Sequence, residues 1–256
     1  MKYLNTEKTS WWNYLERCNF KKNTTMQKNI LLIGGSYGIG ASIASKLKEN
    51  HNIIIASRSS ENIPKGVPHF AFDALKDDIT TLDLPEKIDG LVYCPGSINL
   101  KPFKMMRTET FKEDMELNFH SLVRVVHGLL PKLKNSEQAS LVFFSTVAVK
   151  VGMPFHTSVA AAKGAIEGFA KALAVEYAPN FRVNIIAPSL TDSPLASKLL
   201  NSDAKKEKMA ERHPLKKVGD TEDIAAMAAF LLNEESKWIT GQVFGVDGGL
   251  STLNIN

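Results

Sequence analysis

The stretch Ile33-Gly34-Gly35-Ser36-Tyr37-Gly38-Ile39-Gly40 decides the fold of this chain. It follows the apolar run Asn29–Ile33 and opens a helical pattern over residues 38–49. Glycines here let the backbone turn sharply and approach a pyrophosphate with no Cβ in the way, and a helix N-terminus offers free N–H groups and a positive dipole. A glycine cluster alone is weak evidence for a binding site, because glycine is common in turns. The place of this cluster between a strand and a helix indicates nucleotide binding.

The rest of the chain alternates short apolar runs with longer helical patterns. Continuous β-branched runs predict strands buried on both faces, and strand–helix alternation predicts parallel strands with right-handed crossovers. We therefore expect an α/β protein with a Rossmann-like doubly wound parallel sheet of about seven strands and helices on both faces. The expected strands are 29–33, 52–56, 68–72, 88–93, 140–145, 181–186 and 242–246, and the later helices are 108–130, 156–177 and 221–232. Residues 192–213 show no strand pattern and predict a helical flap.

The composition describes an ordinary globular protein. With 256 residues, 44% hydrophobic and 23% charged, one domain is expected. No run of 18 apolar residues predicts a membrane span, and the lysines behind the net charge of +4 are scattered, so neither a membrane nor a nucleic acid is expected as partner. Cys18 and Cys94 form no disulfide framework, which favours the cytoplasm. We expect no metal site.

The first 25 residues differ from the rest. They are polar, contain Trp11-Trp12 and have no apolar core of a signal peptide. We expect an N-terminal extension over residues 1–25, either frayed or upstream of a natural start at Met26, and one domain over residues 26–256. The alternative is an amphipathic cap that docks its tryptophans on a partner.

A second group of motifs contains the residues that would take part in a reaction. Ser145-Thr146 is followed by Val159-Ala160-Ala161-Ala162-Lys163, and further on come Ile239-Thr240-Gly241-Gln242 and Val246-Asp247-Gly248-Gly249. With the Gly-x-x-x-Gly-x-Gly spacing of the first loop, these motifs resemble the short-chain dehydrogenase/reductases, nearest the 3-oxoacyl-(acyl carrier protein) reductase type, over residues 28–250. In that family the pattern is Tyr-x-x-x-Lys and the tyrosine hydroxyl is the general acid or base. Here Val159 stands at the tyrosine position and cannot carry a proton.

The cofactor expected from this reading is NADP(H). Arg58 follows the second strand, where a guanidinium can clamp a 2′-phosphate, and no Asp or Glu stands there to favour NAD. By resemblance, Asp73 caps the adenine, although a turn-forming Asp is the alternative. Tyr93-Cys94-Pro95-Gly96 replaces the family's Asn-Asn-Ala-Gly, and Cys94 is either a reactive thiol or a small buried hydrophobic residue. The expected cofactor residues are Gly34, Ser36, Tyr37, Gly38, Ile39, Gly40, Arg58, Asp73, Ala74, Gly96, Lys163, Pro188 and Thr191.

The resemblance also implies a reaction centre. Asn118 matches the family's Asn, which anchors a water, and Lys163 matches the Lys, which binds the nicotinamide ribose. Thr146 matches the Ser that holds the substrate oxygen, with Ser145 beside it as the alternative. His156 lies seven residues before Lys163, nearly on the same helix face, and is a candidate proton donor. A surface position in the loop that enters the helix is the alternative for His156.

Two functions follow. The first is an NADP(H)-dependent oxidoreductase acting on a carbonyl of a small-molecule or acyl-carrier-bound substrate, 3-oxoacyl-like or another ketone, with His156 or a water as proton donor. The second is a catalytically impaired NADP(H)-binding subunit that pairs with a partner. By resemblance we expect a homotetramer or a homodimer, packed through the two long helices.

Overall fold

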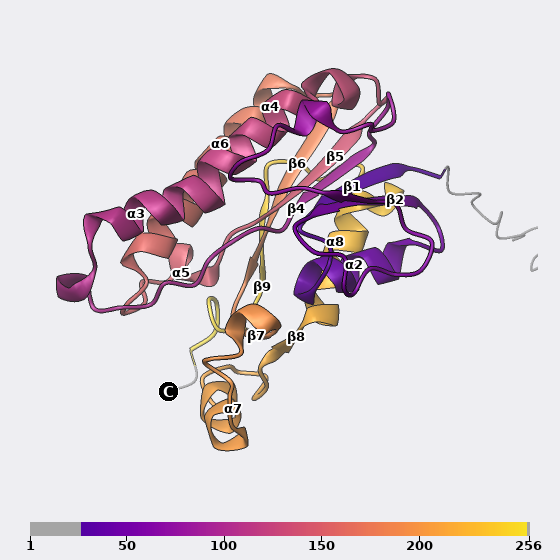
Figure 1. Cartoon of the computed structure of the whole chain (residues 1–256). Coiled ribbons are helices and arrows are strands. Elements are labelled where there is room, and N and C mark those ends of the chain that lie inside the picture. The colour runs from indigo at the N-terminus through magenta and orange to yellow at the C-terminus, as the bar shows by residue number, and fades with distance from the viewer. Residues whose placement is uncertain (1–26, 255–256) are drawn as a thin grey trace, which may run out of the picture.

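A computed structural model describes residues 27–254 (Figure 1). The prediction for residues 1–25 lies outside these residues. Seven parallel strands form the main sheet in the order β3-β2-β1-β4-β5-β6-β9. Their bounds are β1 Asn29–Ile33, β2 Asn52–Ser57, β3 His69–Ala71, β4 Gly90–Tyr93, β5 Ala139–Phe144, β6 Phe181–Pro188 and β9 Val243–Val246. The doubly wound parallel sheet predicted from the sequence is confirmed.

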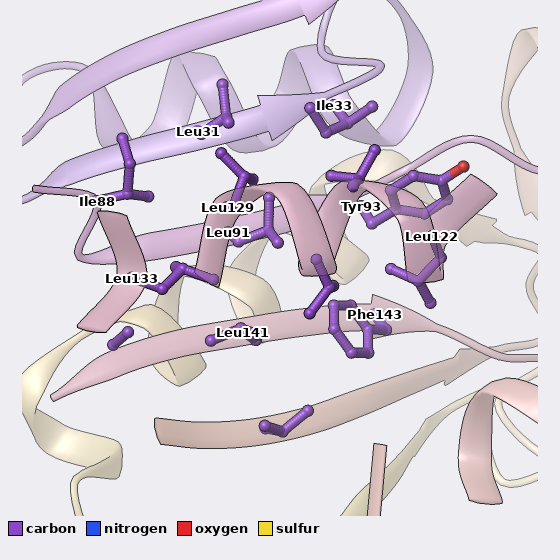
Figure 2. Packing of buried hydrophobic residues seen from close by; sticks show 14 of the residues in the cluster. Leu31, Ile33, Ile88, Leu91, Tyr93, Leu122, Leu129, Leu133, Leu141 and Phe143 are labelled. Atoms are coloured by element: carbon purple, nitrogen blue, oxygen red, sulfur yellow. The ribbon is translucent and has the colours of Figure 1, made fainter. Parts of the chain in front are cut away.

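Helices cover both faces of this sheet (Figure 1). On one face lie α3 (Thr108–Met115), α4 (Ser121–Lys134) and α6 (Thr157–Glu176), and on the other lie α2 (Gly38–Leu47) and α8 (Thr221–Leu232). Each face has its own apolar core. Figure 2 shows the first, in which Leu31, Leu91 and Leu141 of three adjacent strands face Leu122 and Leu129 of α4. Burial of such side chains, at roughly 25 cal/mol per Å² of apolar surface, stabilises this arrangement.

The predicted helix 108–130 is built differently from the expectation. A π-helical turn, η3 (Glu116–His120), separates α3 from α4, and α4 continues through Pro131 to Lys134. Single π-helical turns inside helices occur frequently at functional sites, and Asn118 lies at the middle of this one. The short helix α5 (Val147–Lys150) follows β5.

The predicted flap is helical, as expected. It contains the 3₁₀ turn η4 (Pro194–Ala196) and the helix α7 (Asp203–Ala210). The first residue of the predicted flap, Asp192, ends the two-residue strand β7 (Thr191–Asp192), which pairs with β8 (Gly219–Asp220). The flap follows the carboxyl end of β6. Further 3₁₀ turns are η1 (Ile79–Thr81), η2 (Phe103–Met105) and η5 (Glu234–Ser236).

The order of the strands in the sheet indicates where a ligand would bind. The chain moves outward from β1 to β2 and β3, and then returns to the other side of β1 to build β4, β5 and β6. The order therefore reverses between β1 and β4. In open parallel sheets, ligands bind in the crevice outside the carboxyl ends of the strands at such a reversal.

Candidate active site

A cavity of about 460 Å³ opens at the carboxyl ends of β1, β2, β3 and β4. Ten of the residues predicted to bind the cofactor line it: Gly34, Ser36, Tyr37, Gly38, Ile39, Gly40, Arg58, Asp73, Ala74 and Gly96. Leu195 and Pro194 of the flap line it as well. Pro188, Thr191 and Lys163 are not among its lining residues.

The glycine loop forms one wall of this cavity. Gly34 and Gly38 adopt left-handed φ values of 80° and 56°, which favour glycine. A Cβ at Gly40 would clash with the carbonyl oxygen of Gly34 and lie 2.9 Å from Cα of Gly35. The first turn of α2 carries no acidic residue, so the positive end of its dipole is left for an anion. The loop is therefore shaped for a close approach of phosphate.

Two charged side chains lie along the cavity beyond this loop. Arg58 is exposed, and within residues 27–254 its guanidinium forms no ion pair or hydrogen bond. Asp73 accepts a hydrogen bond from the backbone N–H of Leu75 at 3.1 Å and lies 3.7 Å from the ammonium of Lys76. The turn-forming role proposed as an alternative for Asp73 is thus present, and the same residue still lines the cavity.

Lys163 and Asn118 meet behind Gly96. A Cβ at Gly96 would lie 3.2 Å from Oδ1 of Asn118 and 3.3 Å from Nζ of Lys163, so both polar atoms lie beside this glycine. Both side chains are buried, and Oδ1 of Asn118 has no hydrogen-bond partner among the described residues. Burial lowers the pKa of Lys163 to about 8, an effect that Cys94 and Asp114 partly offset.

A buried carboxyl group that the sequence reading missed holds this arrangement. Asp114 accepts hydrogen bonds from the hydroxyls of Ser97 and Ser158, each at 2.5 Å, and from the amide of Asn99 at 2.6 Å. The amide nitrogen of Asn118 donates to Oγ of Ser97 at 2.9 Å and to the carbonyl oxygen of Asp114 at 2.8 Å. Because both N–H bonds are used, Oδ1 is left pointing toward Gly96. The spacing of four residues between Asp114 and Asn118 is the one sequence signal for this network.

Tyr93 ends β4 and is buried, whereas Cys94, the next residue, is partly buried and lines the cavity. The Tyr93 hydroxyl lies 2.5 Å from Oγ of Ser121 and donates to the carbonyl oxygen of Leu117 at 3.2 Å. Burial raises the pKa of Tyr93 well above its ordinary value, and burial raises the pKa of the Cys94 thiol to about 12. Both groups keep their protons at neutral pH. Cys94 packs against the apolar core, as a small hydrophobic residue does.

The two hydroxyls after β5 have different partners. Ser145 donates to Oε1 of Glu167 at 2.5 Å, whereas Oγ1 of Thr146 accepts a hydrogen bond from the backbone N–H of Ala148 and caps α5. The Thr146 hydroxyl therefore keeps its own proton free to donate. Val159 is buried in the first turns of α6.

His156 is the residue that precedes α6. Its Nδ1 lies 2.7 Å from the carbonyl oxygen of Pro154, within the loop that enters the helix. Within residues 27–254, no hydrogen bond connects His156 to Thr146, Asn118 or Lys163. The structure thus brings Asn118, Lys163 and Gly96 together and shows no contact between His156 and them.

The end of β6 is tied to the flap. Nδ1 of His213 donates its proton to the carbonyl oxygen of Met209 at 3.0 Å. Nε2 of the same ring therefore accepts a hydrogen bond from the Ser189 hydroxyl at 2.8 Å. Thr191 is buried, and its hydroxyl donates to the carbonyl oxygen of Ser189 at 3.0 Å. Pro188 ends β6. These residues shape the loop next to the cavity without lining it.

Comparisons with known proteins identify the family of this chain. A family sequence model described as enoyl-(acyl carrier protein) reductase matches residues 71–251. A 3-oxoacyl-[acyl-carrier-protein] reductase of Chlamydia trachomatis is 31% identical over 245 residues, which cover 88% of this chain and 98% of that protein. The chain belongs to the short-chain dehydrogenase/reductase family. Its members are oxidoreductases, and we therefore describe the site as that of an oxidoreductase.

Solved structures of the family share the fold. The ligand-free aldohexose dehydrogenase of Thermoplasma acidophilum is 25% identical, with a TM-score of 0.81 over 90% of this chain and 96% of that one. The structure of ElxO with NADP bound is 25% identical, with a TM-score of 0.79 over 89% of this chain and 100% of that one. Within the described part of this chain, no cluster of three or more metal-ligating side chains occurs, and no helix is long and apolar enough to cross a membrane.

Proposed function

We propose that this short-chain dehydrogenase/reductase uses NADP(H) to reduce the carbonyl group of a 3-oxoacyl-like substrate or another ketone, as a small molecule or bound to an acyl carrier. The observation that carries this proposal is the cavity that runs from the glycine loop and Arg58 to Gly96, where Lys163 and Asn118 meet. The 3-oxoacyl-[acyl-carrier-protein] reductase among the relatives supports the substrate class.

The residues present fit the cofactor. The glycine loop and the N-terminus of α2 would hold the pyrophosphate, and Arg58, with no other partner in residues 27–254, would hold the 2′-phosphate. Asp73 and Ala74 would border the adenine, and Gly96, Lys163, Pro188 and Thr191 the nicotinamide riboside. When bound, NADPH supplies a hydride. ElxO, of the same fold, has been solved with NADP.

The reacting carbonyl would be oriented by Thr146. Its hydroxyl accepts from Ala148 and can still donate to a substrate oxygen, whereas the hydroxyl of Ser145 is used on Glu167. Asn118 and Lys163 would hold a water and the ribose. Since Val159 cannot give a proton, the donor is atypical. His156 stays the sequence-based candidate, at the start of α6.

The assembly we propose is a homotetramer or homodimer in the cytoplasm. The long helices α4 and α6 lie on the same face of the sheet, and Val175 near the end of α6 is 80% exposed in the single chain. An apolar side chain so exposed on a long helix is consistent with a contact to a second copy. Size-exclusion chromatography with light scattering should give the mass of a dimer or tetramer, and a monomer would refute this assembly.

A second function is favoured by one observation. Val159 is buried and carries no acidic proton, and by resemblance it stands at the family's tyrosine position. This favours a catalytically impaired NADP(H)-binding subunit that pairs with an active partner. Such a subunit would bind the cofactor with the same loop and the same lysine. Cofactor binding alone therefore does not separate the two functions, and turnover does.

The test is transfer of the hydride to product. Purified protein is incubated with NADPH carrying deuterium at C4 and with a panel of ketones, 3-oxoacyl thioesters and enoyl thioesters. We expect deuterium in the alcohol formed from a ketone or 3-oxoacyl substrate, and a loss of about 10²-fold or more in rate for Thr146→Val. Tight NADPH binding with no labelled product from any substrate would favour the non-catalytic subunit.

A further inference from the structure

We propose that Lys163 itself donates the proton to the substrate oxygen, in place of the tyrosine that Val159 replaces. This inference rests on the carbonyl reduction proposed above and names the residue that completes it. Its basis is which side chains around the cavity still have a proton to give.

Most proton-bearing side chains near Gly96 are engaged elsewhere. The Tyr93 hydroxyl is hydrogen-bonded to the carbonyl oxygen of Leu117 and to Oγ of Ser121. The Ser145 hydroxyl is hydrogen-bonded to Glu167. The Ser158 hydroxyl, next to Val159 in α6, donates to Asp114. Each of these three groups would have to give up its hydrogen bond to reach a substrate oxygen, at a net cost of about 0.5–1.5 kcal/mol.

Lys163 is different from these groups. Within residues 27–254, no hydrogen bond or ion pair engages its Nζ, although the side chain is only 7% exposed. Lys163 does not itself line the cavity, but its Nζ lies 3.3 Å from the point that a Cβ of the cavity-lining Gly96 would occupy, and the unpaired Oδ1 of Asn118 lies 3.2 Å from the same point. Val159 precedes Lys163 by one helical turn on the same face and ends far short of where a tyrosine hydroxyl would. The Thr146 hydroxyl also keeps its proton, but an aliphatic hydroxyl holds that proton too tightly to act as a general acid near neutral pH. The Lys163 ammonium is thus the acidic group that remains beside the reaction centre.

The charges around Lys163 suit this role. Cys94, at the end of β4, keeps its proton, because burial raises the pKa of its thiol to about 12. Two neighbours raise the pKa of Lys163 against the effect of its burial, first Cys94 and then Asp114. Asp114, on α3, is the carboxyl group of the two, and it is held in place by Ser97, Asn99 and Ser158. Burial outweighs both neighbours and lowers the pKa of Lys163 to about 8, close to the pH at which a general acid works best. Asp114 is accordingly a positioning residue for the donor.

The reduction balances with this donor. The carbonyl carbon gains a hydride from the reduced nicotinamide, so a C–H bond forms and the π electron pair of the C=O bond moves to oxygen. The oxygen then takes a proton from Nζ of Lys163 as an N–H bond breaks. The ammonium becomes a neutral amine, which regains its proton from solvent.

The first test measures the proton on Lys163 without any cofactor. Lysine labelled with ¹³C at Cε is incorporated, and the Lys163 signal, assigned through its loss in Lys163→Arg, is followed from pH 6 to pH 11. We expect a midpoint near pH 8. Asp114→Asn, which keeps the shape of the side chain and one acceptor oxygen but removes the charge, should lower the midpoint by roughly half a pH unit or more. Glu113→Gln, the exposed neighbour on α3, is the matched control and should leave it unchanged. A midpoint near the ordinary lysine value would overturn the proposal.

The second test links this proton to turnover. With NADPH and a substrate that the panel identifies, the rate of reduction should fall as the pH rises through the Lys163 midpoint, and Asp114→Asn should move that fall to lower pH as well. Lys163→Arg keeps the charge but not a transferable proton, so it should bind NADPH within a few-fold and lose about 10²–10⁴-fold in turnover.

The results that would exclude Lys163 as the proton donor differ from those that would exclude the reductase function. Two results would overturn Lys163 as the donor without overturning the reductase function. The first is a pH dependence of turnover that Asp114→Asn does not change. The second is a loss of turnover in His156→Ala while the titration of Lys163 is unchanged. No turnover on any carbonyl, with NADPH bound, would overturn both.

Discussion

Replacing Lys163 by methionine should stabilise the protein at neutral pH. The side chains have similar length, but the ammonium is buried, and its pKa falls from 10.5 to about 8. A tenfold change in an acid dissociation constant corresponds to about 1.4 kcal/mol, so holding the charged form in the folded protein costs about 3 kcal/mol. This figure already includes the opposing attraction to Asp114, and we expect Lys163→Met to be about 1–3 kcal/mol more stable than the wild type at pH 7.

The sign of the pH dependence follows from the same lowered pKa. Below pH 8 the folded and unfolded chains both carry the proton, and the cost of burying the charge is fully present. Between pH 8 and 10.5 the folded protein loses this proton while the unfolded chain keeps it, so wild-type stability rises with pH. Lys163→Met lacks this rise, and its advantage over the wild type should shrink toward pH 10.5.

Urea denaturation at pH 7 and pH 10 measures this difference. Lys171→Met is the matched control, because Lys171 lies exposed on the same helix and its loss should change stability by less than about 0.5 kcal/mol at either pH. A Lys163→Met protein that is less stable than the wild type at pH 7, or a difference that does not change with pH, would refute the reasoning.

The remaining predictions concern the cofactor. Arg58→Ala should raise the Kd for NADPH by roughly 10–100-fold and change that for NADH by less than about twofold, as followed by nicotinamide fluorescence, since one charge-assisted contact to the 2′-phosphate contributes about 1.5–3 kcal/mol. An equal effect on both cofactors would place the 2′-phosphate elsewhere. Gly40→Ala should abolish binding of either cofactor in the same titration, because the new Cβ has no room beside Gly34 and Gly35. Binding that survives Gly40→Ala would show that the loop can open.

The fold and the cofactor end could be predicted from the sequence because their signals are local. Continuous apolar runs define strands buried on both faces, and the spacing of Gly34, Gly38 and Gly40 defines a tight turn between a strand and a helix. Arg58 and Asp73 follow strands directly, so the parallel sheet brings both to one edge. These residues line one cavity, and their binding of a cofactor stays a prediction.

The centre of the site depends on contacts that no local pattern encodes. Asp114 is bonded to Ser97, Asn99 and Ser158, which lie 15 to 44 residues away in the chain. The sequence around Asp114 is that of an ordinary charged helix, so its burial is a result of packing between α3 and α6. The π-helical turn around Asn118 was likewise not visible in the apolar pattern.

The orientation of His156 is a second such case. Its spacing from Lys163 suggested a shared helix face, but the helix begins one residue later and the ring is turned to the carbonyl oxygen of Pro154. Phe155 before it adopts a left-handed φ of 72°, a loop conformation that helical spacing does not predict. Its role as donor therefore stays a prediction.

The most direct test of the proposed chemistry compares wild type with Val159→Tyr in NADPH oxidation on the same ketone, 3-oxoacyl and enoyl substrates. If Lys163 supplies the proton, the wild type turns over slowly, and the tyrosine variant is faster by up to about 10²–10⁴-fold, the usual contribution of a positioned general acid. Turnover that appears in Val159→Tyr and is absent from the wild type on every substrate would contradict this chemistry and identify the protein as a non-catalytic NADP(H)-binding subunit.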